Sequence, residues 1–127
     1  MKVDVKFLSA KDCFLVTVNG EVSGEVFVSS ISDLYARREY SLHTNVIWDL
    51  NGISGFANVH FDPKVIGRLI ASRRSARVGK LMMVSEKSIE SNIFSTFCQA
   101  MSEAGQEILF FKSLDEAFTF LSKNSSD

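Results

Sequence analysis

The stretch NVIWDLNGISGFANVHFDPKVIG, residues 45–67, decides how the rest of the chain is interpreted. It opens with an apolar run up to Asp49, which is typical of a strand covered on both faces in an α/β sheet. The polar, glycine-punctuated segment 51–61 is predicted to be a loop. Asp62 is then expected to cap a helix over residues 63–75, with proline in its first position. The inward stripe of that helix would be Val65, Ile66, Leu69 and Ile70.

Upstream, two segments rich in β-branched and aromatic residues, 3–8 and 13–18, flank the polar SAKD and predict a β-hairpin. The segment NGEVSGE then breaks the chain, and Ser23 is a good N-cap for a helix. Apolar residues recur at helical spacing up to about Arg38, so they predict one buried helical face. That face consists of Phe27, Ile31, Leu34 and Tyr35.

Downstream, the short apolar runs KLMMVS and EILFF predict two more strands. Between them, a helix is predicted to start at Ser85 or Ser88 and to stop at Gly105. The final helix, SLDEAFTFL, opens with a capping box formed by Ser113 and Glu116. The apolar positions of the first of these helices are Ile89, Ile93, Phe94, Phe97, Cys98 and Met101, and those of the second are Leu114, Ala117, Phe118 and Leu121.

The predicted order is β-β-α-β-α-β-α-β-α. Helical crossovers between successive strands require parallel neighbours, so the fold class is α/β with a mixed, mostly parallel sheet of about five strands and flanking helices. A chain of 127 residues fits one domain. We place this domain at residues 1–122, followed by a frayed tail at 123–127.

Composition narrows the function classes. Apolar residues make up 46% of the chain, charged residues 23%, and the net charge is −1, which argues against disorder and against a wholly basic nucleic-acid module. No run approaches the roughly 20 apolar residues of a membrane helix, and the first residues do not suit a signal peptide, so a cytoplasmic location is expected. Cys13 and Cys98 lie far apart inside apolar runs and are expected to be buried, reduced thiols.

The element order, together with WDLNGIS after the central strand and ILFFKSLDEAFTFL near the C-terminus, resembles the STAS domain, named for sulfate transporters and anti-sigma factor antagonists. Within that superfamily the chain looks most like the SpoIIAA-like branch, which is sometimes grouped with Sec14-type lipid-binding folds. The resemblance covers nearly the whole chain. It implies the α/β fold described above and a regulatory or binding role.

In the phosphorylatable STAS regulators, a strand ending in Asp-Leu-Ser-Gly leads to an Asp-Ser-Ser-Gly signature, and a serine at the next helix N-terminus is the switch. Here Asp49, Leu50 and Gly52 match the first part, with Asn51 in place of the serine. Residues 57–63, ANVHFDP, do not contain the second part. The resemblance therefore does not carry over the phosphoserine, and Ser54, the one hydroxyl in the predicted loop, is interpreted as an ordinary turn serine.

Open α/β sheets bind ligands at the carboxyl ends of their strands, which makes the loop after the central strand the candidate ligand or partner site. Asp49 either contributes to that site or accepts N–H bonds from the turn at Asn51 and Gly52, and we favour the structural role. Neighbouring strand ends should bring Ser85 and Lys112 nearby. The candidate residues are Asp49, Asn51, Ser54, Phe56, Asn58, Val59, His60 and Phe61.

Catalytic and metal-binding motifs are missing from the sequence, and the two histidines lack metal-ligand spacing, so no catalytic residue, metal or cofactor is expected. His43 is interpreted as a surface residue. His60 is either a ligand or base, or a solvated imidazole. A small enzyme that uses Asp49 and His60 remains as a third class of hypothesis, and it requires the two side chains to face one cleft.

Residues 64–80 contain six basic side chains and no acidic one. An acidic protein partner or an anionic membrane surface would recognise such a patch, although cations also suit a helix C-terminus. Nucleic acid is not indicated, because no aromatic residues are interleaved with the basic ones. The basic patch consists of Lys64, Arg68, Arg73, Arg74 and Arg77, with Lys80 beyond it.

Two hypotheses follow for the function. The leading one is a non-enzymatic, STAS-like regulatory or interaction module that binds a protein partner and lacks the usual phosphoserine switch. The alternative is an apolar small-molecule or lipid-binding domain with reversible membrane association, in which Phe56, Val59 and Phe61 close over a cavity. A homodimer is compatible with either hypothesis.

Overall fold

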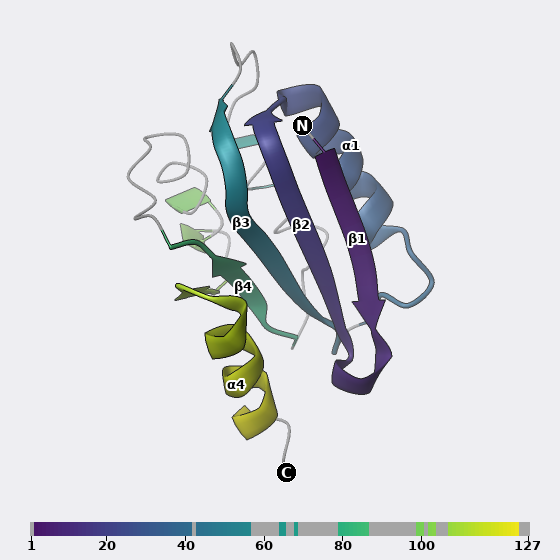
Figure 1. Ribbon diagram of the computed structural model, residues 1–127. Coiled ribbons are helices and arrows are strands. Elements are labelled where there is room, and N and C mark those ends of the chain that lie inside the picture. The colour runs from purple at the N-terminus through teal and green to yellow at the C-terminus, as the bar shows by residue number, and fades with distance from the viewer. Residues whose placement is uncertain are drawn as a thin grey trace.

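Five strands of the described residues form one mixed sheet in the order β1-β2-β3-β4-β5 (Figure 1). The computed structural model describes residues 2–41, 43–56, 64–65, 68, 79–86, 99–100, 102–103 and 107–124. β1 (Lys2–Leu8) is antiparallel to β2 (Cys13–Val22), whereas β2, β3 (Asn45–Phe56), β4 (Leu81–Val84) and β5 (Ile108–Phe111) are parallel. The predicted α/β class with a mostly parallel sheet is confirmed.

The opening hairpin is also confirmed, with Val5 opposite Val16 across the two strands. A short 3-10 turn, η1 (Ser9–Lys11), connects them. Asp12 completes the turn with a φ of 46°, in the left-handed region that aspartate tolerates better than most residues. The polar SAKD segment therefore places the Asp12 backbone at the start of β2.

β2 and β3 both continue beyond their predicted ends. β2 reaches Val22 rather than Val18, and β3 reaches Phe56, so the prediction of a loop from Asn51 to Phe56 is wrong. The two polar extensions lack the pattern of a buried strand, but each supplies hydrogen-bonding partners for the backbone of the other. Val22 lies opposite Phe56, and the register shifts twice along this part of the pair.

Gly52 is required in this extension because the two strands approach closely. A Cβ atom at position 52 would collide with the Asn19 side chain and would lie 2.9 Å from the Val18 carbonyl oxygen. In the sequence, Asn51 and Gly52 look like a flexible turn. In the structure, Gly52 is the residue that lets β3 pair closely with β2.

Helix α1 (Gly24–Tyr35) covers one face of the sheet (Figure 1). Its Phe27, Ile31 and Leu34 side chains are buried, as predicted, in a core that also contains Trp48 of β3. The Phe27 and Trp48 rings stack with their centroids 5.5 Å apart. Tyr35 packs against this core and is only partly buried.

The ends of α1 differ in part from the prediction. Ser23 is the N-cap, and its carbonyl accepts the Phe27 N–H at 2.9 Å, but its side chain makes no capping hydrogen bond. The helix ends at Tyr35 instead of near Arg38. The apolar stripe itself stops at Tyr35, so packing no longer supports the following residues as a helix.

Helix α4 (Leu114–Asn124) covers the opposite face (Figure 1). Ala117 and Leu121 are buried there against Cys13, Ile47 and Met82, with Leu114 and Phe118 partly buried beside them, as the periodicity predicted. The helix extends to Asn124, so residues 123 and 124, expected in a frayed tail, are helical. Residues 125–127 lie outside the described residues.

The capping box of α4 forms with one change of partner. The Ser113 hydroxyl accepts the Glu116 N–H at 3.2 Å, as expected. The Glu116 carboxylate reaches one residue further back than the ideal box and accepts the Lys112 N–H at 3.1 Å. Both contacts satisfy backbone donors at the start of the helix.

Helical residues also occur at two of the predicted crossovers, at Lys64, Val65 and Arg68 and at 99–100 and 102–103. Val65 is 57% exposed, so its place in the inward stripe is wrong. It lies at the margin of that stripe on a helical wheel, about 100° from Ile66. Ile66, Leu69 and Ile70 lie outside the described residues. No helix in the described ranges is long and apolar enough to span a membrane.

Candidate functional site

Asp49 and Asn51 lie at the carboxyl edge of the sheet and connect β3 to β4. The Asp49 carboxylate accepts the Asn51 N–H at 3.1 Å. The Asn51 side-chain carbonyl in turn accepts the Glu86 N–H, just after β4, at 2.7 Å. Asp49 thus makes the kind of local bond expected of its structural role, although Asn51 belongs to a strand and not to a turn.

The other strand ends at this edge use their donors internally. The Ser85 N–H donates to the Phe111 carbonyl at 3.0 Å, and the Lys112 N–H donates to Glu116. His43 is exposed, as predicted, and lines a pocket at the opposite edge. No described serine at the carboxyl edge therefore has a described histidine beside it as a base.

The remaining candidates are separated by the extension of β3. Ser54 is an exposed strand residue, and Phe56 is the last residue of β3. Asn58, Val59, His60 and Phe61 lie outside the described residues, as does any meeting of Asp49 with His60. The structure therefore joins Asp49 and Asn51 and places Ser54 further along the same strand.

The basic patch is described at two of its residues. Lys64 and Arg68 are helical and exposed. Residues four apart lie on one face of a helix, so Lys64 and Arg68 place their positive charges on the same helical face. Arg73, Arg74 and Arg77 lie outside the described residues.

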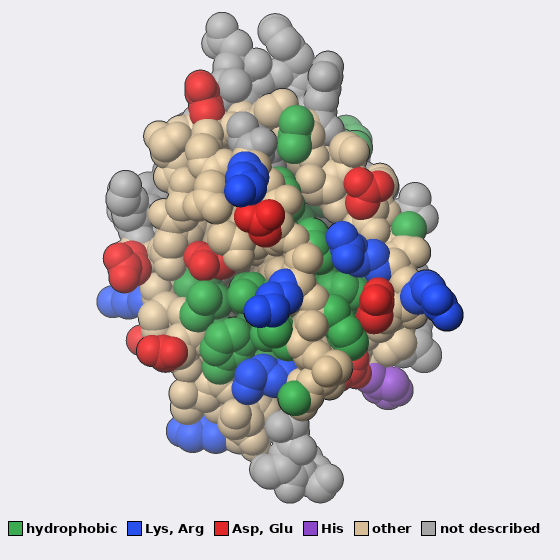
Figure 2. All heavy atoms as spheres, turned by 45° about the vertical axis from the view of Figure 1, so that its right-hand side comes forward, with side chains coloured by type: hydrophobic (Ala, Val, Ile, Leu, Met, Phe, Trp, Pro, Cys, Tyr) green, Lys and Arg blue, Asp and Glu red, His purple; other side chains and the backbone are tan. Residues whose placement is uncertain are grey.

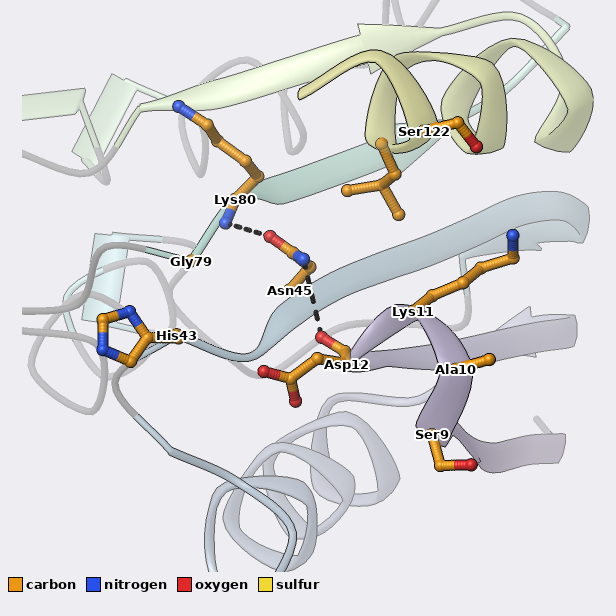
Figure 3. A pocket seen from close by; sticks show the side chains of 10 residues that line it. Ser9, Ala10, Lys11, Asp12, His43, Asn45, Gly79, Lys80 and Ser122 are labelled. Atoms are coloured by element: carbon orange, nitrogen blue, oxygen red, sulfur yellow. Dashed lines mark hydrogen bonds between the residues drawn. The ribbon is translucent and has the colours of Figure 1, made fainter. Parts of the chain in front are cut away.

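A pocket of about 430 Å³ opens at the amino edge of the parallel strands, away from the predicted site (Figure 3). It lies between the turn that contains η1, the start of β3, the residues before β4 and the last turns of α4. The residues that line it are Ser9, Ala10, Lys11, Asp12, His43, Asn45, Gly79, Lys80, Leu121 and Ser122.

Asn45 is the centre of the hydrogen bonds in this pocket. Its N–H and its side-chain amide donate to the Asp12 carbonyl, at 2.9 and 3.5 Å, and its side-chain carbonyl accepts the Lys80 N–H at 2.7 Å. Behind it, the fully buried Thr44 hydroxyl accepts the Ser41 N–H at 2.9 Å and lies 3.3 Å from the Asp12 carboxylate. These bonds fix the starts of β2, β3 and β4 relative to one another.

The charged groups of the pocket do not converge. Figure 3 shows the ammonium groups of Lys11 and Lys80 directed toward opposite ends. Lys11 places its ammonium group 5.2 Å from the centre of the Phe118 ring, a cation–π contact. Within the described part of the chain, no group of three or more His, Cys, Asp or Glu residues could hold a metal ion.

Cys13, the first residue of β2, is buried and is not joined in a disulfide, as expected. Burial, together with the nearby Asp12 carboxylate, raises the pKa of its thiol to about 12. The thiolate form that reacts with electrophiles is therefore scarce at neutral pH. Cys98 lies outside the described residues.

Sequence reasoning missed the pocket because its bonds join distant segments. Asn45 meets Asp12 and Lys80 across separations of 33 and 35 residues. One signal was present: Gly79 directly precedes the predicted strand KLMMVS, and a glycine there often marks a close backbone approach. A Cβ atom at this position would collide with the Thr44 carbonyl.

No family model and no curated protein sequence matches the chain. Similar solved structures include two that are named as anti-sigma factor antagonists. The anti-sigma factor antagonist SpoIIAA in its unphosphorylated form is 14% identical, with a TM-score of 0.58 over 96% of this chain and 98% of that one. A Thermotoga maritima protein assigned as an anti-sigma factor antagonist is also 14% identical, with a TM-score of 0.62 over 94% of each chain. The chain therefore has the STAS fold of the SpoIIAA type.

Proposed function

We propose that this chain is a non-enzymatic regulatory domain that binds a protein partner, in the manner that the name anti-sigma factor antagonist implies for its structural neighbours. The observation that carries the proposal is the similarity of fold, which extends over 94–96% of the chain in the two comparisons. The match thus extends over nearly the whole chain and nearly the whole of each neighbour. The partner would be a protein of the class that such antagonists bind.

The partner surface lies at the carboxyl edge, on the extension of β3. The pairing of β3 with β4 ends at Asp49 and Val84, whereas β3 continues to Phe56 with β2 on its other side. Among the described residues, the β4 side of this extension has no neighbouring strand. Ser54 is exposed there, and an exposed strand backbone offers N–H and C=O groups to a partner.

This regulation does not use the phosphoserine of the related switches. The second part of the related pattern carries the switch serine, and residues 57–63, ANVHFDP, contain no serine. Asn51 replaces the serine of the first part, and its side-chain carbonyl accepts the Glu86 N–H, which gives the residue a structural role. The only described hydroxyl on the β3 extension is that of Ser54.

Affinity capture from an extract of the native host tests the proposal. The wild-type chain should retain one specific protein in stoichiometric amount, and Ser54→Arg should abolish its retention by adding bulk and charge to the extension. Thr119→Arg, at an exposed position of α4, is the matched control and should retain the partner. Capture of no protein contradicts the function, and equal capture by Ser54→Arg contradicts the surface.

Intact-mass measurement of the chain purified from the same host tests the missing switch. We expect no species that carries a phosphate. A phosphorylated form that maps to Ser54, and that loses the captured partner, would overturn this part of the proposal.

The lipid-binding alternative is favoured by one observation. Val65 is 57% exposed on the helical stretch that also exposes Lys64 and Arg68. An apolar side chain flanked by cations is suited to an anionic membrane surface. If this alternative is correct, the chain will sediment with anionic vesicles and not with neutral ones, and Val65→Asp will release it. Native mass spectrometry would then show a bound lipid in place of a protein.

A further inference from the structure

β1 is an edge strand whose outer side is open in the described structure. Among the described residues it pairs with β2 alone, and Lys2–Phe7 alternate in exposure, with Leu8 partly buried like Phe7. Val3, Val5 and Phe7 pack partly into the α1 core, whereas Lys2, Asp4 and Lys6 are exposed on the α4 side of the sheet. Figure 2, which turns the β1 side forward, shows basic and acidic side chains standing between exposed hydrophobic groups.

The charges of β1 have no charged neighbour across the strand pair. Asp4 lies opposite Thr17, and Lys6 lies opposite Leu15. Their remaining neighbours would be residues of a strand added on the open side. Edge lysines usually oppose such additions, but here an aspartate stands between two lysines, so the strand can complement itself.

We propose that a second copy of this chain pairs its β1 antiparallel to the first, centred on Val5. In this register Asp4 faces Lys6 of the second copy, and Lys6 faces its Asp4, because the arrangement has a two-fold axis. On the other face Val5 meets Val5, and Phe7 meets Val3. Two opposite-charge pairs and an apolar row then form from one repeated strand.

The same charges exclude the neighbouring registers. A shift that centres the pair on Asp4 places the two Asp4 carboxylates opposite each other and Lys2 opposite Lys6, so that every charged pair repels. A shift by a single residue turns the apolar row to the polar face. Centring on Val3 retains two charge pairs but shortens the overlap and loses Phe7.

The apolar face of the proposed β1–β1 pair also favours a second copy of this chain as the partner. Phe7 belongs to an aromatic cluster with Phe14 and Tyr40, with centroids 4.9 Å apart between Phe7 and Phe14 and 6.5 Å between Phe14 and Tyr40. Phe7 and Tyr40 are only partly buried. A two-fold axis normal to the sheet keeps both copies of α1 on one face, so Val3 of the second copy covers the open side of Phe7.

Sedimentation equilibrium over a concentration series tests the pairing, with thermal unfolding to verify that each variant is folded. The wild type should dimerise, and Asp4→Lys and Lys6→Asp should each weaken the dimer by about tenfold or more, because two attractive pairs become repulsive. Lys2→Asp is the matched control: it changes the same charge on the same face, yet position 2 faces Leu8 in the proposed register.

Two rescues make the test specific. A mixture of Asp4→Lys and Lys6→Asp chains should form a heterodimer, because both charge pairs are restored between the copies. The double swap Asp4→Lys with Lys6→Asp should dimerise like the wild type. A wild type that stays monomeric, single variants that dimerise normally, or rescues that fail would each overturn the proposal.

Discussion

The amino and carboxyl edges of the parallel sheet each contain an asparagine whose side chain accepts a backbone N–H next to β4, but the two edges differ in role. At the amino edge Asn45 accepts the Lys80 N–H before β4, and at the carboxyl edge Asn51 accepts the Glu86 N–H after β4, both at 2.7 Å. β3 is thus held to β4 by an asparagine on each side of their paired segment. The separation along the chain is 35 residues in each case.

The surroundings of the two asparagines differ. Asn45 is half-buried and has further bonds to the Asp12 carbonyl, with the buried Thr44 behind it, whereas Asn51 is exposed and, within the described part of the chain, is supported by Asp49. The amino edge is therefore built mainly for stability. The carboxyl edge keeps its strand extension accessible, which suits the proposed partner surface.

Gly79→Ala is expected to have the largest effect, because it breaks the amino edge at its closest approach. The new methyl group would collide with the Thr44 carbonyl oxygen and lie 2.7 Å from the carbonyl carbon, and backbone atoms cannot rotate away. The free energy of unfolding should fall by about 3 kcal/mol. Urea unfolding monitored by circular dichroism measures this loss.

The control is Gly55→Ala at the carboxyl edge. A Cβ atom at position 55 has no atom within 4 Å, so stability should change by less than about 0.5 kcal/mol. Equal losses in the two variants would mean that the amino edge is no more tightly packed than the extension of β3.

Asn45→Ala and Asn51→Ala compare the two asparagines directly. Asn45→Ala removes two side-chain hydrogen bonds at a half-buried position and should lower the free energy of unfolding by about 1.5 kcal/mol. Asn51→Ala removes the one bond to Glu86 at an exposed position and should cost about half as much. Chemical denaturation of both variants measures the two losses. The slope of the unfolding free energy against denaturant concentration should equal that of the wild type. A larger loss for Asn51→Ala would reverse the assignment of the edges.

The fold was largely predictable from the sequence because its signals are local. The short apolar runs at 45–50, 81–84 and 108–111 indicate strands, although Phe110 of the last run is 54% exposed, and the stripe through Phe27, Ile31 and Leu34 has a helical period. The extension of β3 was not predictable in this way. Its pattern indicates a turn, and it becomes a strand only because β2 supplies the partner backbone and Gly52 lets the two strands approach.

The candidate site was predictable only in part. Asp49 ends an apolar run next to Asn51-Gly52, so a polar strand end was visible in the sequence. The bond from Glu86 to Asn51 joins residues far apart in the chain and depends on the register of β3 with β4, which no local pattern encodes. For the same reason the amino-edge pocket was not predicted. The role of Asn45 in it depends on Asp12 and Lys80, which lie far from Asn45 along the chain.

Ser113→Ala tests a second bond of the carboxyl edge, at the start of α4. The substitution removes the acceptor of the Glu116 N–H, and the free energy of unfolding should fall by about 1 kcal/mol. Ser113→Asp retains an acceptor and adds a charge that suits a helix N-terminus, so it should restore most of the loss. Thermal unfolding of the pair measures both. A loss that aspartate does not restore would point to packing of Ser113 in place of capping.

Cys13 provides the most selective test of the amino edge, because its contribution to stability changes with pH only in the alkaline range. Its pKa is raised from an ordinary value of 9.0 to about 12, first by burial and then by Asp12. The folded state therefore keeps the thiol proton that the unfolded state releases, and the contribution to stability is complete below pH 9 and falls as the pH rises toward 12. Between pH 9 and 10 this fall should be about 1 kcal/mol. Cys13→Ala lacks the group, so its stability should decline less over that interval, whatever its offset at pH 7. Parallel pH profiles for the two proteins would show that the thiol at the start of β2 is not held in a dry, closely packed site.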